Sequence, residues 1–305
     1  MSKSTSEVCT ASPVELGLVA RGLTLSALAF GDSSRTPMIA LHGWLDNAAS
    51  FLQLAPLLEQ YYVVALDLPG HGKSDARPLG GSYFHADYAL DVAHAADALG
   101  FESFVLLGHS MGGGVATLVA AAMPERVTHL LLIDGLGPYS DSVEKTAHQL
   151  GRAVAQSLSS SQELRRYTSL EELFARRAAV SKDIADDALR PIVERNAVQR
   201  EDESGQSYWQ WSTDPRLKLA SPTRLTHEGV LHLLAEIKSP VLNLLATTGM
   251  MMGFPEIKKR TGRLVNAKTV NIEGHHHFHL DGPVSQVAEM ITGFVSAVPP
   301  FGRVE

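Results

Sequence analysis

A serine between two glycines is the first feature of this sequence that could do chemistry. The segment Gly108-His109-Ser110-Met111-Gly112 follows an apolar run and precedes a Gly/Ala-rich stretch that predicts a helix. This strand–turn–helix context is typical of a nucleophile elbow, whose strained turn needs small residues two positions to either side of the serine. Backbone amides at the start of the helix then face the negative charge that develops in acyl transfer. We therefore predict that Ser110 is a nucleophile and not an incidental serine in a glycine-rich turn.

A serine hydroxyl needs a base, and a histidine-rich segment late in the chain offers candidates. Residues 274–279 read Gly-His-His-His-Phe-His and follow the last predicted strand. In proteins with such an elbow the three catalytic residues follow one another along the chain in the order serine, acid, histidine. One of these histidines should therefore reach Ser110. The residues alone do not choose among them. A metal site is the alternative, but adjacent loop side chains point in different directions and no second ligand group is obvious, so we predict no metal.

The acid has two possible positions. The loop after the predicted strand at 241–245 is the usual one, but residues 247–252 contain no carboxylate, and the first to follow is Glu256. The other position is Asp134, which directly follows three leucines and an isoleucine. A carboxylate there can orient a histidine and stabilise its cation, although an Asp-Gly pair is also a common turn. By position and elimination we predict Asp134 as the acid.

Two backbone amides are predicted to form an oxyanion hole. One belongs to Met111, the residue after the nucleophile, and the other should come from the loop after the predicted strand at 38–41. That loop continues His-Gly-Trp-Leu-Asp-Asn. Gly43 allows a sharp turn that aims the amide of Trp44 into the site. The side chains of His42 and Trp44 can pack elsewhere while this amide serves.

Alternating strands and helices are expected to position these groups. Several predicted strands are apolar throughout, as strands buried on both faces are; they cover residues 15–20, 23–30, 38–41, 62–66, 104–107, 130–133, 241–245 and 269–272. The first two should be antiparallel. Helices are predicted at residues 48–59, 86–99 and 115–122. The alternation predicts a parallel sheet wound by right-handed crossovers.

The alternation stops after the sixth strand. Residues 138–235 are polar, show a helical pattern and contain no convincing central strand. Their aromatic side chains Tyr208, Trp209 and Trp211 could line a pocket or attach the segment to the core. We predict one α/β core domain, formed by residues 1–137 and 236–305, with residues 138–235 inserted after strand 6 as a helical cap, or lid.

Composition excludes several classes of protein. The net charge of −7 and the lack of a Lys/Arg cluster argue against a nucleic-acid partner. The single cysteine, Cys9, cannot form an internal disulfide. The N-terminal segment has no apolar core of the length that a signal peptide needs, and no apolar run is long enough for a membrane span. We predict a cytoplasmic protein without a membrane span, and the oligomeric state stays open.

These segments together resemble the α/β-hydrolase superfamily over nearly the whole chain. The motifs that carry this resemblance are LHGW (41–44), ALDLPGHGKSD (65–75), LLGHSMGG (106–113) and GHHHFHLDGP (274–283). Further segments look most like the serine hydrolase-like branch, namely HGWLDN (42–47), LIDGLGP (132–138) and WSTDPRL (211–217). The resemblance implies a mostly parallel eight-stranded sheet flanked by helices.

The resemblance also helps to assign the site. Family members usually place a proline seven residues after the catalytic histidine, so Pro283 implies that His276 is the base. Some haloalkane dehalogenases, a related branch, carry their acid after the sixth strand, which supports Asp134. Their nucleophile is an aspartate, however, so Ser110 argues against dehalogenation.

These inferences together predict a carboxylesterase-like serine hydrolase. It would cleave a small-molecule carboxylic ester or thioester with a hydrophobic acyl group through Ser110, His276 and Asp134, by way of an acyl-enzyme and without metal or cofactor. Two alternatives stay open. One is hydrolysis of another bond, such as a carbon–carbon bond, and the other is a non-catalytic, ligand-binding homologue on the same fold.

Overall fold

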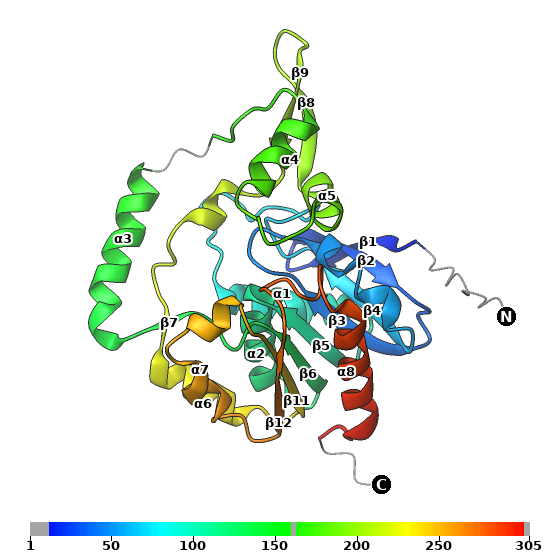
Figure 1. Ribbon diagram of the computed structural model, residues 1–305. Coiled ribbons are helices and arrows are strands. Elements are labelled where there is room, and N and C mark those ends of the chain that lie inside the picture. Colours follow the sequence, from blue (N-terminus) through cyan, green and yellow to red (C-terminus); the bar gives the residue numbers. More distant parts are fainter. Residues whose placement is uncertain (1–11, 160–162, 302–305) are drawn as a thin grey trace, which may run out of the picture.

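An eight-stranded sheet forms the centre of the protein (Figure 1). The computed structural model describes residues 12–159 and 163–301, so Cys9 lies outside the described residues. The strands, in their order across the sheet, are β1 (Val14–Ala20), β2 (Leu23–Phe30), β4 (Tyr61–Leu66), β3 (Thr36–Leu41), β5 (Phe104–His109), β6 (Val127–Ile133), β11 (Val241–Ala246) and β12 (Ala267–Ile272). β2 pairs antiparallel with β1 and β4, and the other neighbours are parallel. All eight predicted strands are present.

Both faces of the sheet are buried, which explains the continuous apolar runs in its central strands. On one face, side chains such as Ile39 and Leu106 pack with helices α1 (His85–Ala98), α2 (Met111–Ala122) and α6 (His227–Glu236). On the other face, alternate residues such as Met38 pack with helix α8 (Val284–Ala297). A short helix, α7 (Ile257–Thr261), follows β11. This three-layer arrangement brings the carboxyl ends of the parallel strands to one edge, where the predicted site residues lie.

The helix predicted over residues 48–59 is wrong. The chain instead forms two 3₁₀ turns, η1 (Ala48–Phe51) and η2 (Ala55–Leu57). Pro56 stands at the start of the second turn. A proline has no amide hydrogen and its ring clashes with the carbonyl four residues earlier, which disfavours one continuous α-helix over this stretch.

A segment with little sheet connects β6 to β11. Before α6 it contains helices α3 (Thr146–Ser159), α4 (Leu170–Ala178) and α5 (Asp186–Arg195), the 3₁₀ turns η3 (Val143–Lys145) and η4 (Pro215–Lys218), and the short strands β7 (Ser140–Asp141), β8 (Ala197–Glu201), β9 (Ser207–Trp211) and β10 (Leu225–Thr226). In Figure 1, α4 and α5 gather with β8 and β9 beyond the sheet, whereas α3 stands apart from them. No central strand was expected here, and the antiparallel pair β8–β9 and the parallel pair β7–β10 both lie outside the eight-stranded sheet.

The β8–β9 hairpin has a local explanation. A tight turn joins the strands, with Gly205 at a φ of 81° and its amide donating to the carbonyl of Asp202. Trp209 and Trp211 pack against an apolar cluster that includes Leu173 and Leu189 of α4 and α5. The aromatic residues therefore attach this part of the segment to its own small core.

The last helix of the expected cap packs differently. Val230 and Leu234 of α6 are buried in the same cluster as α1 and α2. α6 thus belongs to the helical layer that covers the sheet, although all but its last residue fall within the predicted boundaries 138–235. None of the helices in the described part of the chain has the length and apolar character needed to cross a bilayer.

Candidate active site

Ser110 lies on a strained turn between β5 and α2. Its φ of 52° and ψ of −115° are unusual for a residue with a side chain. A Cβ atom on Gly108 would stand 2.5 Å from the carbonyl oxygen of Gly112, and one on Gly112 would stand 2.2 Å from that of Leu41. The turn therefore needs both glycines, because backbone atoms occupy the space that side chains would fill.

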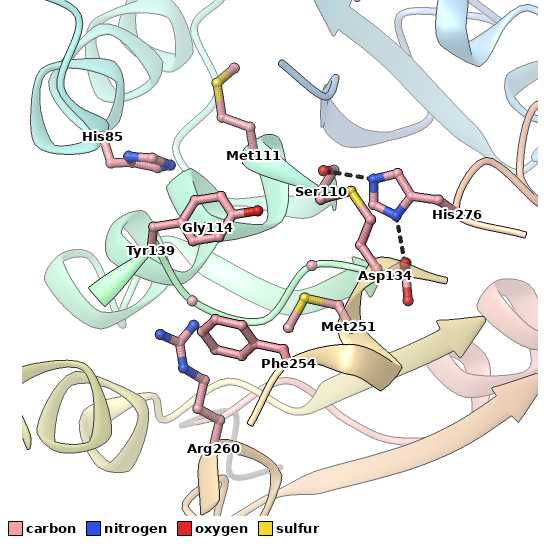
Figure 2. A pocket seen from close by; sticks show the side chains of 13 residues that line it. His85, Ser110, Met111, Gly114, Asp134, Tyr139, Met251, Phe254, Arg260 and His276 are labelled. Carbon is pink, nitrogen blue, oxygen red and sulfur yellow. Dashed lines mark hydrogen bonds and ion pairs between the residues drawn. The ribbon is translucent and has the colours of Figure 1, made fainter. Parts of the chain in front are cut away.

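Ser110, His276 and Asp134 form one chain of hydrogen bonds (Figure 2). The Nε2 atom of His276 lies 2.8 Å from the Ser110 Oγ atom, and its Nδ1 atom lies 2.5 Å from Oδ2 of Asp134. Because a carboxylate only accepts hydrogen bonds, Nδ1 carries the proton and Nε2 is free to accept from the serine hydroxyl. The Asp134 side chain is fully buried, and 14% of the His276 side chain is exposed. The three predicted residues thus come together from β5, β6 and the loop after β12.

The loop after β11 covers Asp134. The Asp134 residue itself has a φ of 40°, and the amide of Ala246 donates to its Oδ1 atom over 3.1 Å. A Cβ atom on Gly249 would stand 2.3 Å from its Oδ2 atom. In this chain the end of β11 therefore orients the carboxylate that follows β6, and the loop after β11 encloses it.

The two predicted oxyanion amides lie in segments that touch each other. The amide of Met111 is the first of α2 and so has no acceptor within the helix. The amide of Gly112 donates to the carbonyl of His42, which fastens the loop after β3 to the start of α2. Trp44 stands in a turn of that loop, and its half-exposed side chain donates from Nε1 to the carbonyl of Leu217.

The remaining histidines of the predicted cluster have other partners. The Nε2 atom of His275 lies 2.8 Å from the carbonyl oxygen of Asp281. His277 has its Nε2 atom 3.6 Å from Asp46 Oδ2, and His279 is buried, with its ring 5.6 Å from that of Phe51. Of the four histidines, His276 is the one whose side chain hydrogen bonds to Ser110.

His109 is a residue of the site that its motif does not single out. It is fully buried, its Nε2 atom lies 3.1 Å from the His276 carbonyl oxygen, and burial holds its pKa well below the usual range. Side-chain nitrogens of His109, His276 and His277 lie within 4.8 Å of one another, close enough to suggest metal ligands. Both nitrogens of His276 already take part in the hydrogen bonds to Asp134 and Ser110, so a metal there would have to break one of them.

A pocket opens beside Ser110 and His276 (Figure 2). Its wall is mostly apolar and is formed largely by the side chains of Met111, Tyr139, Met250, Met251 and Phe254. The remaining lining residues are His85, Gly114, Asp134, Gly135, Gly137 and Arg260. Burial lowers the pKa of His85 to about 4, so this side chain is neutral at pH 7. The aromatic residues of β9 lie outside this wall.

A second serine–histidine contact lies near the pocket. The Oγ atom of Ser140 lies 2.8 Å from Nδ1 of His227, whose Nε2 atom is 3.8 Å from an oxygen of Glu256. Arg260 also donates from Nη2 to the same Ser140 oxygen over 2.8 Å. Ser140 is buried in the short strand β7 and does not lie on a strand-to-helix elbow.

Comparison with known proteins agrees with this fold. The family model of the α/β hydrolase fold matches residues 36–283. The chain is 30% identical to a serine hydrolase-like protein of Danio rerio, over 89% of this chain and 85% of the relative, and 32% identical to a probable serine hydrolase of Drosophila melanogaster, over 89% and 84%. This chain belongs to the α/β-hydrolase fold family and, within it, to the serine hydrolase-like branch.

Solved structures extend the comparison. The crystal structure of a hypothetical protein from Pseudomonas aeruginosa PAO1 superposes with a TM-score of 0.84 at 38% identity, covering 94% of this chain and all of that one. A thioesterase domain from the curacin biosynthetic pathway gives a TM-score of 0.80 at 21% identity, covering 92% of this chain and all of that one. At that identity the second likeness concerns the fold alone.

Proposed function

We propose that this protein is a carboxylesterase-like serine hydrolase that cleaves an ester or thioester of an apolar acyl group. The observation that carries the proposal is the hydrogen-bond chain from Asp134 through His276 to Ser110, which ends on a strained elbow at the pocket wall. An acid, a base and a hydroxyl in this order are the groups that nucleophilic acyl transfer requires.

The reaction follows from the roles of these groups. Ser110 Oγ attacks the carbonyl carbon while its proton passes to Nε2 of His276, and Asp134 stabilises the imidazolium that forms. The amides of Met111 and Trp44 donate to the oxyanion. The tetrahedral intermediate collapses, His276 gives its proton to the alcohol or thiol leaving group, and an acyl-serine remains. Water attacks this ester by the same route, which releases the acid and restores the serine hydroxyl.

The inserted segment has a smaller part in the proposed acyl pocket than its predicted role as a lid would suggest. Of the described residues in 138–235, Tyr139 lines the pocket, whereas Met250, Met251 and Phe254 come from the stretch after β11. We keep residues 138–235 as the inserted cap, with α6 packed on the core. We expect the stretch after β11 to set the acyl preference. A cytoplasmic location stays a prediction from the sequence.

The test is a substrate panel with wild-type protein and Ser110→Ala. The panel contains 4-nitrophenyl esters and acyl thioesters from acetyl to long-chain acyl groups. We expect turnover by the wild type, loss of turnover in Ser110→Ala, and a chain-length preference that shifts when Met251 is replaced by Ala. If the protein instead cleaves only carbon–carbon bonds, for example in diketones, it is a carbon–carbon bond hydrolase. A protein inert on the whole panel, whose Ser110 also resists a fluorophosphonate, would be a binding protein.

A further inference from the structure

Arg260 of α7 is a buried cation in the pocket wall. It is 2% exposed, and its guanidinium donates from Nη1 to the carbonyl of Leu136 and from Nη2 to the carbonyl of Pro138 and to Ser140 Oγ. These three acceptors are all neutral. Within the part of the chain that the structure describes, no carboxylate forms an ion pair with Arg260; Glu256 acts on it only through a longer-range field.

Other arginines with little exposure are neutralised. Arg195 pairs with Asp67 and Glu15, and Arg177 donates to Asp46 over 2.6 Å. A buried charge is costly unless an opposite charge accompanies it. At Arg260, two carbonyls, one hydroxyl and the ring of Phe254 at 4.6 Å offset part of this cost and leave the charge itself without a counter-ion.

The guanidinium also has unused hydrogen-bonding capacity. It carries five N–H donors, of which the protein contacts use three. Burial lowers the pKa of Arg260 to about 10, so the group stays charged at neutral pH. A cation with a free donor can hold a carboxylate by its charge and a single charge-assisted hydrogen bond.

Arg260 lies on the side of the pocket away from the hydrogen-bonded serine and histidine (Figure 2). Between the two sides stand Tyr139, Met251 and Phe254, whose carbon atoms suit a chain of methylene groups. The other titratable groups of the wall do not compete. His85 is neutral, and Asp134 is enclosed behind His276.

We propose that Arg260 binds an anionic group at the far end of the acyl chain. The preferred substrates are then esters or thioesters whose acyl group has an apolar middle and ends in a carboxylate. This inference rests on the proposed function, and it replaces a wholly hydrophobic acyl group with one that carries a charge at its end.

The first experiment compares matched substrates on the wild-type protein. The monomethyl esters of dicarboxylic acids with four to eight carbons are paired with the corresponding ester amides, which have nearly the same shape and no charge. We expect kcat/KM to be at least tenfold higher for the carboxylate at the best chain length, with an advantage that shrinks as salt is added. Equal or faster turnover of the amide at every length would overturn the inference and leave the proposed function intact. Turnover of neither series, nor of the 4-nitrophenyl esters, would overturn both.

The second experiment changes the cation. In Arg260→Gln, kcat/KM for the carboxylate should fall to the level of the amide, while the amide changes less than threefold. Arg260→Lys should keep part of the preference. A purely structural arginine would lower both substrates equally, which would contradict the proposal. Arg263→Gln, an exposed site three residues further on, is the matched control and should leave the ratio unchanged. If Arg260→Gln does not fold, the comparison of carboxylate and amide substrates on the wild-type protein remains the test.

Discussion

Two serine–histidine pairs lie near the same pocket, and they differ in what surrounds the serine oxygen. Ser110 sits at the start of a helix, and its histidine is held by a buried carboxylate at 2.5 Å. The Ser140 oxygen accepts a hydrogen bond from Arg260, and the acid behind its histidine is 3.8 Å away.

This difference teaches that a hydrogen bond between serine and histidine does not make a nucleophile. A cation that donates to the oxygen withdraws electron density from the lone pairs that would attack a carbonyl. At Ser110 the amides at the helix start face the charge that develops on the substrate instead. We therefore propose Ser110 as the nucleophile, whereas Ser140 accepts a hydrogen bond from Arg260.

The largest effect should come from Ser110→Ala. Removing the nucleophile of such a triad lowers kcat by about 10⁴-fold or more. Initial rates with 4-nitrophenyl esters measure the loss, and a fluorophosphonate should label the wild type and not the variant. Retained labelling in Ser110→Ala would show that another serine reacts, and the comparison would then be wrong.

A smaller but still large effect should follow from Asp134→Asn. The amide keeps the shape of the side chain but favours the wrong tautomer of His276, so kcat should fall about 10³- to 10⁴-fold. Glu256→Gln is the matched control at the other pair and should change kcat less than about threefold, a range typical of residues outside the chemistry. A larger loss in the control than in Asp134→Asn would exchange the two assignments.

Acid should destabilise the region around Ser110 first. Burial lowers the pKa of His42 to about 4 and that of His71 to about 3, and it also lowers those of His109 and His279. The folded protein keeps these histidines neutral, whereas in the unfolded chain they become protonated near pH 6.5. The free energy of unfolding is therefore unaffected above pH 6.5 and decreases as the pH falls towards 4.

For His42 alone this loss is about 2 to 3 kcal/mol of the free energy of unfolding at pH 4. Urea denaturation between pH 7 and 4 measures it, and His42→Gln should show a flatter dependence on pH. Hydrogen exchange should report earlier loss of protection in β5 and α2 than in β7. Equal curves for variant and wild type would contradict the assignment of a buried, neutral His42.

The smallest effect on activity is expected for Ser140→Ala. Because this serine only supports Arg260 and His227, kcat/KM for a neutral ester should change less than about threefold. Stability should fall by about 1 to 2 kcal/mol, since buried donors lose their acceptor. Thermal unfolding and ester hydrolysis, measured on the same preparation, check both statements. A loss comparable to that of Ser110→Ala would mean that the second pair takes part in catalysis.

The fold was largely predictable because a strand that is buried on both faces has a continuous run of apolar residues, and the central strands all show such a run. The exceptions are local. Pro56 divides what reads as one amphipathic helix, and the Asp202–Gly205 turn of the β8–β9 hairpin lies within a polar segment without apolar alternation.

The candidate site was predictable to different depths. Ser110 follows from a motif and its context, and Asp134 from the absence of an acid in residues 247–252. The residues alone left four histidines open, and only the resemblance to the family selected His276. Arg260 gave no signal, because in the sequence it follows two lysines and reads as part of a solvated helix face. Its missing counter-ion depends on which side chains the fold brings near.

The position of the acid also affects how this protein can change during evolution. Because Asp134, the proposed acid, follows β6, the loop after β11 carries no side chain of the proposed triad, and it contributes Met250 and Met251 to the pocket wall. Mutations at these two methionines can alter which acyl groups fit while the proton-transfer groups keep their hydrogen bonds. Gly249 is the one position of this loop that cannot vary in this way, since any side chain there would collide with the Asp134 carboxylate. Under the proposed mechanism, substrate range and catalytic power can therefore be selected separately.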